Sequence, residues 1–260
     1  MTVNFVKYQG TGNDFILIDH RHPFFNKEDA ELISRLCDRR FGIGADGLIL
    51  LETHPEVDFE MVYFNADGRP SSMCGNGGRC TVHFAKQLGI IGSKTRFMAV
   101  DGIHEASIEN NWVALHMGDV RQIDTLTGAY FLDTGSPHHV QLCDAVDAVD
   151  VPYQGAKIRY GTYGQAGANV NFVNQEASDS FKVRTYERGV EDETLSCGTG
   201  VTAVALAMHH AGYTASNTVQ IETPGGRLQI SFTKQEEGYT NVVLAGPATA
   251  VFTGQWESNS

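Results

Sequence analysis

Cys74-Gly75-Asn76-Gly77 and Cys197-Gly198-Thr199-Gly200 are two versions of one motif, a cysteine before Gly-x-Gly, and each opens an apolar run at helical spacing. In both versions a further glycine, Gly89 or Gly212, follows twelve residues after the motif's last glycine. A thiol at a helix N-terminus meets unsatisfied backbone N–H groups and the positive end of the helix dipole, which favour the thiolate. The sequence therefore predicts two helices that each begin at an activated thiol.

The two motifs belong to a longer repeat with a shift of 123 residues. At this shift Gly12 matches Gly135, Gly44 matches Gly167, Ala45 matches Ala168, Tyr63 matches Tyr186, Gly89 matches Gly212, Thr95 matches Thr218, and Gly102 matches Gly225. Coinciding turns over such a distance indicate an internal duplication. We expect an α+β fold of two pseudo-symmetric lobes, each a curved, mostly antiparallel sheet wrapped round a central helix.

The repeat also predicts the domain boundaries. The N-terminal lobe takes residues 1–118, with 248–260 returning to it through a strand at Ala250–Phe252, and the C-terminal lobe takes 119–247. The pattern of residues 28–39 predicts an amphipathic helix capped by Asn26, with only a weak counterpart at Asp144–Val149 in the second lobe. Because pockets favour domain interfaces, we expect a site at the junction of the lobes.

Composition excludes several classes of protein. The chain has 260 residues, 42% of them hydrophobic, and a formal net charge of −12 with scattered lysines and arginines, which argues against nucleic-acid binding. No apolar run reaches the roughly 18 residues of a membrane span, and the first residues lack the apolar core of a signal peptide. We therefore expect a cytoplasmic location and no membrane partner.

The five cysteines indicate reduced thiols rather than a disulfide framework. Cys37, Cys80 and Cys143 are expected to be small buried hydrophobes. The spacing Cys74-x5-Cys80 does not match the short zinc-ligand spacings, so no metal is predicted. No Walker or Rossmann fingerprint and no lysine in a pyridoxal-phosphate context is recognisable, which favours a reaction without a cofactor.

A duplication that faces two thiols across a cleft offers one acid–base group to each face of a bound carbon. This geometry suits inversion of a stereocentre, in which a thiolate removes a proton from one face and a thiol returns one to the other. Two helix N-termini aimed at the α-carboxylate would stabilise the carbanion.

The chain resembles the diaminopimelate epimerase family along almost its whole length. The matching stretches are Lys7-Tyr-Gln-Gly-Thr-Gly-Asn-Asp-Phe15, Phe64-Asn-Ala-Asp-Gly68, Cys74-Gly-Asn-Gly-Gly-Arg-Cys80, Gly135-Ser-Pro-His138, Gly167-Ala-Asn169, Tyr186-Glu-Arg-Gly189, Cys197-Gly-Thr-Gly200 and Pro224-Gly-Gly-Arg227. The resemblance implies a cofactor-independent, cytoplasmic homodimer that interconverts LL- and meso-diaminopimelate for lysine and cell-wall precursor synthesis.

The resemblance also implies roles for individual residues. Cys74 and Cys197 would be the acid–base pair; Asn13, Asn65, Asn169, Glu187 and Arg188 would hold the substrate; Gly75, Asn76, Gly198 and Thr199 would present N–H groups to the reacting carboxylate; His138 and Glu187 would adjust the pKa values of the thiols; and Phe252 would lie at the dimer contact. Blander roles stay open for three of them: Asn65 as a turn residue, His138 as a core histidine, and Glu187 as a surface strand residue.

Two positions depart from the family. Gly47 stands where a substrate-binding glutamine is common, and Ser136 stands where asparagine is common, so the substrate is less secure than the type of reaction.

Two alternatives compete with this interpretation. A proline or hydroxyproline racemase-like enzyme shares the architecture, but that family typically has histidine after its first Cys-Gly, where this chain has Asn76. A non-catalytic, redox-sensing protein would instead use Cys74 and Cys197 to form a disulfide.

Overall fold

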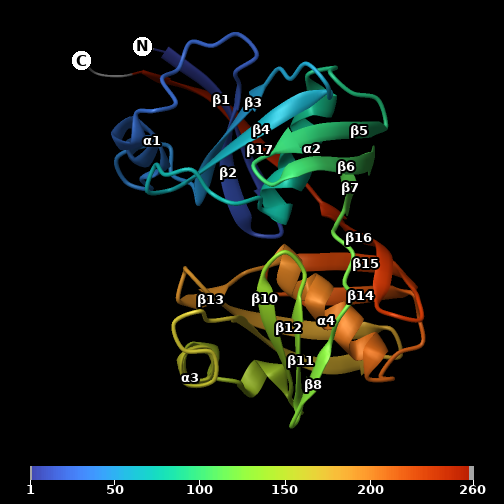
Figure 1. The fold of residues 1–260 in the computed structure, drawn as a ribbon. Helices are drawn as coiled ribbons and strands as arrows, with labels where there is room; N and C mark the ends of the chain where they lie inside the picture. The colour runs from blue at the N-terminus through green and yellow to red at the C-terminus, as the bar shows by residue number, and fades with distance from the viewer. Residues whose placement is uncertain (1, 258–260) are drawn as a thin grey trace. The chain divides into compact units, whose positions relative to one another are not determined.

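The computed structural model describes residues 2–257 and divides the chain into two compact units (Figure 1). The first unit runs as far as Leu115 and takes up the chain again from Pro247 onward, whereas the second is the continuous stretch His116–Gly246. The division predicted from the repeat has its boundaries at residues 118 and 247.

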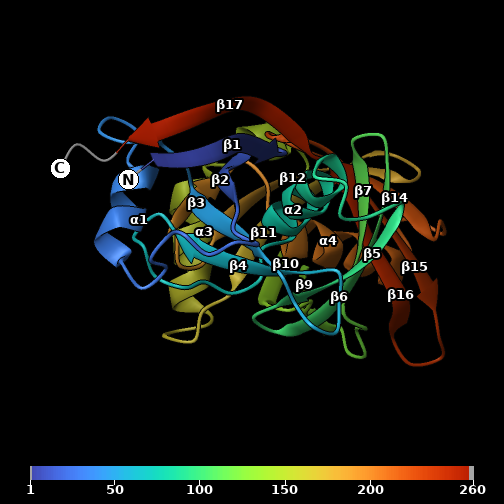
Figure 2. The same ribbon diagram turned by 90° about the horizontal axis from the view of Figure 1, so that it is seen from above.

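Eight strands of the first unit form a sheet in the order β17-β1-β2-β3-β4-β5-β6-β7. They are β1 (Thr2–Gly10), β2 (Asn13–Asp19), β3 (Gly47–Glu52), β4 (Phe59–Asn65), β5 (Lys94–Ala99), β6 (Gly102–Glu109), β7 (Trp112–His116) and β17 (Thr249–Glu257). The pairs β2–β3 and β4–β5 are parallel and the other pairs are antiparallel. The last strand, β17, lies alongside the first, β1, as Figure 2 shows.

The second unit has the order β8-β9-β10-β11-β12-β14-β15-β16, with the short β13 paired to β12. Its strands are β8 (Asp124–Leu126), β9 (Ala129–Asp133), β10 (Pro137–Leu142), β11 (Asn169–Ala177), β12 (Ser180–Glu187), β13 (Asp192–Thr194), β14 (Thr218–Thr223), β15 (Gly226–Lys234) and β16 (Tyr239–Pro247). As in the first unit, the third and the fifth pair of neighbouring strands in this order are parallel, here β10–β11 and β12–β14. The α+β class, the duplication and the mostly antiparallel sheets predicted from the sequence are therefore confirmed.

Each unit wraps its strands round one helix. In the first unit α2 (Gly75–Gln87) packs against β1 to β4, β6 and β17, and in the second α4 (Gly198–His210) packs against β9 to β12, β14 and β15 (Figure 1). Gly89 and Gly212 follow the two helices with φ of 71° and 79°, a left-handed conformation that suits glycine after a helix C-terminus. The two helices have the same length and begin 123 residues apart, as the repeat predicts.

The core of the second unit forms around α4 because this helix is apolar on nearly every face. Its buried Val201, Val204 and Leu206 belong to one cluster with Val219 and Ile221 of β14. A helix without a polar face has to be enclosed, and every residue of α4 from Gly200 to Met208 is buried.

The repeat shifts by one residue after the helices. The strands β5 and β14 align at 124 residues, so that Gly102 (φ 126°) corresponds to Gly226 (φ 136°) and Thr95 to Val219. The predicted matches of Gly102 with Gly225 and Thr95 with Thr218 were wrong, because the link between helix and strand is one residue longer in the second unit.

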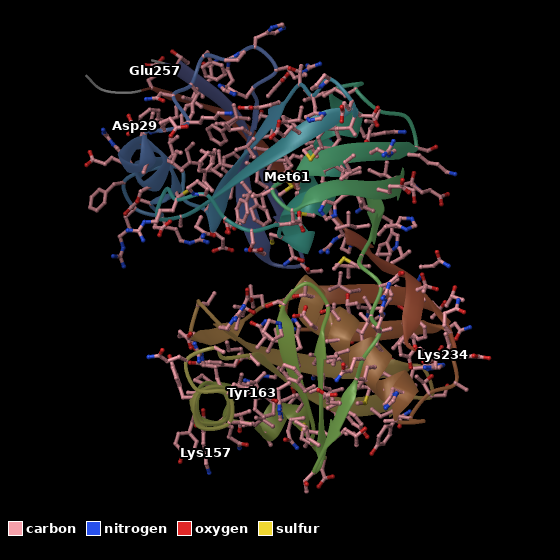
Figure 3. The ribbon with its side chains drawn as sticks, viewed as in Figure 1. Asp29, Met61, Lys157, Tyr163, Lys234 and Glu257 are labelled. Atoms are coloured by element: carbon pink, nitrogen blue, oxygen red, sulfur yellow. The ribbon has the colours of Figure 1, made fainter. Side chains whose placement is uncertain are left out.

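The helix α1 covers Ala30–Cys37, which is shorter than the predicted 28–39. Its N-cap is Asp29, whose carboxylate accepts a hydrogen bond from the Leu32 N–H at 3.0 Å, and Figure 3 shows Asp29 at the start of this helix. Asn26, the predicted cap, accepts instead from a backbone N–H in the preceding turn. That prediction was wrong because the residue directly before the helix reaches the third helical N–H.

The counterpart of α1 in the second unit is α3 (Val151–Gly161), which connects β10 to β11 as α1 connects β2 to β3. The predicted counterpart, Asp144–Val149, contains only the short 3₁₀ turn η1 (Val146–Ala148), so this prediction was wrong. The local signals of α3 are Asp150, whose side chain caps the helix, and Pro152 in its first turn.

Candidate active site

The two motif cysteines are the N-caps of the two central helices. Cys74 precedes α2 with φ −113° and ψ 119°, and Cys197 precedes α4 with φ −118° and ψ 112°. Cys197 is buried and Cys74 is partly buried. In each unit the first-turn N–H groups and the helix dipole therefore lie next to a thiol, an arrangement that also suits a carboxylate ligand.

In the first unit, Cys74 contacts an amide oxygen. Its Sγ lies 3.6 Å from Oδ1 of Asn13, and the same oxygen lies 3.4 Å from Nδ2 of Asn76. The Asn76 oxygen accepts a hydrogen bond at 3.0 Å from Arg79, a guanidinium with no exposed surface. These contacts bring Asn13, Cys74 and Asn76 together within the first unit, as three of the predicted site residues.

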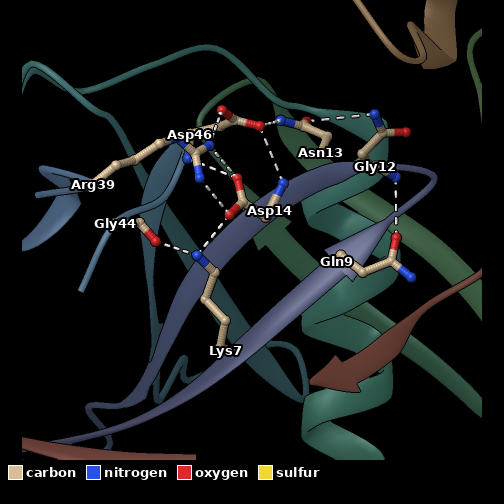
Figure 4. A network of polar contacts seen from close by, with 9 residues as sticks. Lys7, Gln9, Gly12, Asn13, Asp14, Arg39, Gly44 and Asp46 are labelled. Atoms are coloured by element: carbon tan, nitrogen blue, oxygen red, sulfur yellow. Dashed lines mark hydrogen bonds and ion pairs between the residues drawn. The ribbon is translucent and has the colours of Figure 1, made fainter. Parts of the chain in front are cut away.

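Asn13 is held in turn by a charged cluster, drawn in Figure 4. Its Nδ2 donates to Asp46 at 2.5 Å, and Arg39 binds both Asp46 and Asp14. Lys7 forms an ion pair with Asp14 at 2.6 Å. Burial alone would raise the pKa of Asp14, but the hydrogen bonds from Arg39 and Lys7 outweigh it and hold that pKa well below its ordinary value.

In the second unit, Cys197 contacts a hydroxyl. Its Sγ lies 3.5 Å from Oγ1 of Thr199, and that hydroxyl lies 2.9 Å from Nε2 of His138. His138 is completely buried on β10, and its Nδ1 lies 3.1 Å from the amide nitrogen of Asn171. Burial, with a smaller effect of the nearby Arg188 charge, lowers the pKa of His138 to about 3, so this imidazole is neutral at neutral pH.

A second polar group of this unit lies where β11 begins and β12 ends. The Asn169 amide donates to Oγ of Ser136 at 3.0 Å and accepts from the Arg188 N–H at 2.8 Å. The Arg188 side chain is exposed and donates to the Ala166 carbonyl, while the Glu187 carboxylate accepts from a threonine hydroxyl of β13. Because β11 pairs with β12, Asn169 at the start of β11 lies beside Glu187 and Arg188 at the end of β12.

The two remaining predicted residues, Asn65 and Phe252, are exposed. Asn65 ends β4 with an exposed side chain, and its backbone closes a turn with Gly68 and Arg69. Phe252 lies on β17 with 49% of its surface exposed. That the groups around Cys74 and Cys197 face one substrate stays a prediction.

The structure explains one departure from the resembling family. A Cβ atom on Gly47 would lie 2.5 Å from the Phe64 carbonyl oxygen and 2.5 Å from the Tyr63 ring. The Tyr63 ring, itself packed edge-on against Phe15, occupies the space that a larger side chain at position 47 needs.

The other cysteines differ from the two at the helix starts. Cys37 and Cys80 are buried, and burial raises the pKa of each thiol to about 12. Cys143 is only partly buried, and its Sγ donates to the Val173 carbonyl at 3.4 Å. Cys37 and Cys80 are therefore inert core residues, as predicted, whereas Cys143 is less enclosed than predicted.

Two residues of the site escaped the sequence analysis. Asn171 alternates with Asn169 along β11, so both project from the same face of a buried strand, and two amides on such a face are an unusual pattern. Asp46 corresponds to Asn169 at the shift of 123, and each of them binds the side chain at the start of its neighbouring strand, Asn13 or Ser136. Reading the repeat for polar residues as well as for glycines would have found Asp46, whereas the counterpart of Asn171 at this shift is the apolar Leu48.

Over residues 2–257, no group of three or more histidine, cysteine, aspartate or glutamate side chains is arranged to hold a metal ion. Across the same residues, no helix combines the length and apolar character that a membrane crossing requires.

The sequence is similar to known proteins over nearly its full length. A family model described as Diaminopimelate epimerase matches residues 5–123 and 130–251. A diaminopimelate epimerase of Flavobacterium psychrophilum is 57% identical over 95% of this chain and 97% of its own, and one of Chlorobaculum tepidum is 44% identical over 94% and 98%.

The fold is also similar to solved structures with little sequence identity. A phenazine biosynthesis protein of the PhzF family from Bacillus anthracis has a TM-score of 0.80 at 13% identity, over 99% of this chain and all of its own. A hydroxyproline epimerase from Agrobacterium vitis has a TM-score of 0.68 at 12% identity, over 98% and 92%. These likenesses concern the fold alone.

Proposed function

Because the chain belongs to the diaminopimelate epimerase family, we propose that Cys74 and Cys197 are the acid and the base of its reaction. The protein is an isomerase that interconverts LL- and meso-2,6-diaminopimelate. The observation that carries the two-thiol mechanism is the pair of matching N-caps, in which a cysteine precedes a buried helix in each half of a duplicated fold.

The proposed step is a proton exchange on one carbon. The thiolate of one cysteine takes the α-proton, and the electron pair of the broken C–H bond passes into the α-carboxylate group. The thiol of the other cysteine then gives its proton to the opposite face of the carbon and is left as the thiolate. Each turnover inverts the centre and exchanges the roles of the two sulfurs.

The α-proton of an amino acid is weakly acidic, so the carbanion needs strong stabilisation. We assign this to the first-turn N–H groups of α2 and α4, at Gly75 and Asn76 and at Gly198 and Thr199. Donors fixed in place before the reaction stabilise developing charge without reorganising. This assignment is consistent with a reaction that needs no cofactor, and activity that survives dialysis against a chelator is the expected result.

The distal end of the substrate is a second amino-acid group, with its own carboxylate and ammonium. We assign Arg188 to the carboxylate, since its guanidinium is exposed and suits a bidentate contact. Asn13, Asn65 and Asn169 supply amide contacts, and Glu187 supplies a negative charge for the ammonium group. His138 and Glu187 also adjust the pKa values of the thiols.

Solvent isotope exchange tests the mechanism directly. Reduced enzyme incubated with LL-diaminopimelate in deuterated water should place deuterium at the inverted α-carbon of the meso product. Cys74→Ala and Cys197→Ala should each lower epimerisation by a factor of at least about 10². Cys143→Ala serves as the control for loss of a thiol and should keep turnover. Full turnover by either of the first two variants would contradict the proposal.

The competing function is racemisation of proline or hydroxyproline, because a hydroxyproline epimerase shares the fold. Asn76 and the stretch Tyr186–Gly189 favour diaminopimelate. Parallel assays with diaminopimelate, proline and hydroxyproline decide between them, and turnover of either cyclic substrate alone would overturn the assignment.

We further propose that the enzyme works as a cytoplasmic homodimer in the synthesis of lysine and of peptidoglycan precursors. Support for the dimer comes from β17, which carries exposed Val251 and Phe252. Phe252→Glu should convert the dimer to a monomer in light scattering. A wild-type chain that is already monomeric at the same concentration would contradict this assignment.

A further inference from the structure

The two sulfurs have partners of opposite hydrogen-bonding character. Cys197 lies against a hydroxyl, which can donate a proton, whereas Cys74 lies against a carbonyl-type amide oxygen, which can only accept. Whether each contact favours thiol or thiolate depends on how the neighbouring groups are oriented, and the surrounding hydrogen bonds determine those orientations.

The orientation of Asn171 follows from its contacts. Its nitrogen lies 3.0 Å from the His139 carbonyl oxygen, and its oxygen accepts from the Thr185 hydroxyl at 2.9 Å. Turning the amide round would place two oxygens 3.0 Å apart. Gly200 leaves the space for this amide, since a Cβ there would lie 2.4 Å from the Asn171 oxygen. The nitrogen of Asn171 is therefore the group that faces His138.

That orientation selects the tautomer of His138. Because Asn171 donates to Nδ1, the single proton of the neutral imidazole is on Nε2. The Nε2–H then donates to the Thr199 hydroxyl oxygen at 2.9 Å. The hydroxyl proton of Thr199 is left to point to its other partner in the described part of the chain, the Cys197 sulfur. A sulfur that accepts a hydrogen bond from a hydroxyl, and that also lies at the start of a helix, is stabilised as the thiolate.

The opposite holds at Cys74. Asn13 donates its Nδ2 to the Asp46 carboxylate, so its oxygen is turned toward Cys74 and Asn76. An amide oxygen repels a thiolate and accepts a hydrogen bond from a thiol, so this contact favours protonated Cys74. Arg79 supplies a buried positive charge to the same network, and a thiolate on Cys74 would raise the pKa of the Arg79 guanidinium. At rest the guanidinium opposes the effect of the Asn13 contact, and it stabilises the thiolate that forms once Cys74 has given up its proton.

We propose that the resting enzyme holds Cys197 as the thiolate and Cys74 as the thiol, with Asn171 and Asn13 as the positioning residues that set this difference. The proposal rests on the proposed function for its catalytic meaning, namely that Cys197 takes the first proton. The charged and titratable groups around the two networks include Arg39, Asp46, Arg79 and Cys80 in the first unit, and His138 and Arg188 in the second.

The test follows the alkylation of each thiol separately. Reduced enzyme without substrate is treated briefly with iodoacetamide between about pH 5 and 10, and the Cys74 and Cys197 peptides are quantified by mass spectrometry. Because Cys197 is the more buried sulfur, the pH midpoint of each rate is compared rather than the rate itself. We expect the midpoint of Cys197 to lie roughly one pH unit or more below that of Cys74.

Variants separate the hydrogen-bond chain from a merely structural role. Thr199→Val removes the donor at nearly the same volume and should raise the midpoint of Cys197 by roughly one unit while leaving that of Cys74 in place. Thr199→Ser keeps the hydroxyl and should keep the midpoint. Asn171→Ala should also raise the midpoint of Cys197. The midpoint of Cys74, measured in the same sample, serves as the internal control for folding.

Each outcome bears on the proposal. A lower midpoint at Cys74, equal midpoints, or a Thr199→Val variant with an unchanged Cys197 midpoint would overturn it, and the first result would show that Arg79 outweighs the Asn13 contact. Alkylation needs no substrate, so these results are independent of the isotope-exchange assay. If the enzyme epimerises the substrate but rests with Cys74 as the thiolate and Cys197 as the thiol, only this inference is refuted. Absence of epimerisation refutes the proposed function.

Discussion

At the scale of single residues, Gly47 shows how a close approach determines identity. The Phe64 carbonyl oxygen is part of the backbone of the neighbouring strand, so it cannot move aside for a larger side chain as a flexible group would. A glutamine at this position, common in the resembling family, would require both Phe64 and the Tyr63 ring to shift. The departure from the family is thus a property of local packing.

Gly47→Ala should lower the free energy of unfolding by about 1–3 kcal/mol, the usual cost of overpacking. Gly92→Ala is the matched control, because a Cβ there meets nothing within 4 Å. Urea unfolding of both variants against the wild type measures the difference. Equal stability of the two variants would show that the Tyr63 region yields without cost.

His138 should make stability depend on pH. Its pKa is lowered to about 3 by burial, whereas an unfolded histidine titrates near 6.5, so below about pH 6.5 the unfolded chain binds a proton that the folded chain does not. This contribution to stability is complete above that pH and is lost as the pH falls toward 3, by about 1.4 kcal/mol per unit.

The measurement is the free energy of unfolding between about pH 5 and 7 for the wild type and His138→Gln. The variant should show a shallower pH dependence, whereas His22→Gln, which changes an exposed histidine, should not. An unchanged slope in the first variant would mean that His138 is not held neutral.

At the scale of helices and strands, local signals and tertiary context contribute differently. The central helices were predictable because cysteine, glycines and an apolar run coincide twice, and the strands because they alternate. The helix α3 was not, since Gly155 lies within it, where a Cβ would meet the Tyr186 side chain at 2.3 Å. Its glycine serves close packing against β12 and weakens the helical pattern.

The site shows the same limit. Sequence predicted Asn13 and Asn169 from the resemblance, but the partners that orient them, Asp46 and Ser136, depend on which strands become neighbours. Asn171 looked like an ordinary strand residue because its role arises only when β10 pairs with β11 and brings His138 beside it.

Asp29→Ala should destabilise α1 by about 1 kcal/mol, because the Leu32 N–H loses its acceptor. Asn26→Ala, at the position first predicted as the cap, should cost less, since its hydrogen bond lies in the preceding turn. Chemical denaturation of the two variants compares them. A larger loss at Asn26 would restore it as the residue that starts the helix.

At the scale of the whole molecule, a reaction on two faces of one carbon requires both helix-start thiols to reach the same substrate. This requirement yields a chemical test that needs no ligand. Mild oxidation of the reduced enzyme should join Cys74 to Cys197 and abolish activity, and dithiothreitol should restore it.

Peptide mapping identifies the pair, and Cys143 serves as the control thiol because it follows β10 and does not begin a helix. Recovery of Cys74 and Cys197 only as separately oxidised sulfurs, with no cross-linked peptide, would count against their acting on a single atom.

The position of β17 has a consequence for the order in which the protein is made. The first strand, β1, precedes the whole of the second unit in the chain, whereas its partner β17 follows that unit. The second unit is one uninterrupted stretch of chain, whose final strand, β16, ends at Pro247. During translation the first unit therefore receives its outer strand only after the whole second unit has been synthesised, so the half that is begun first is the half whose chain is completed last.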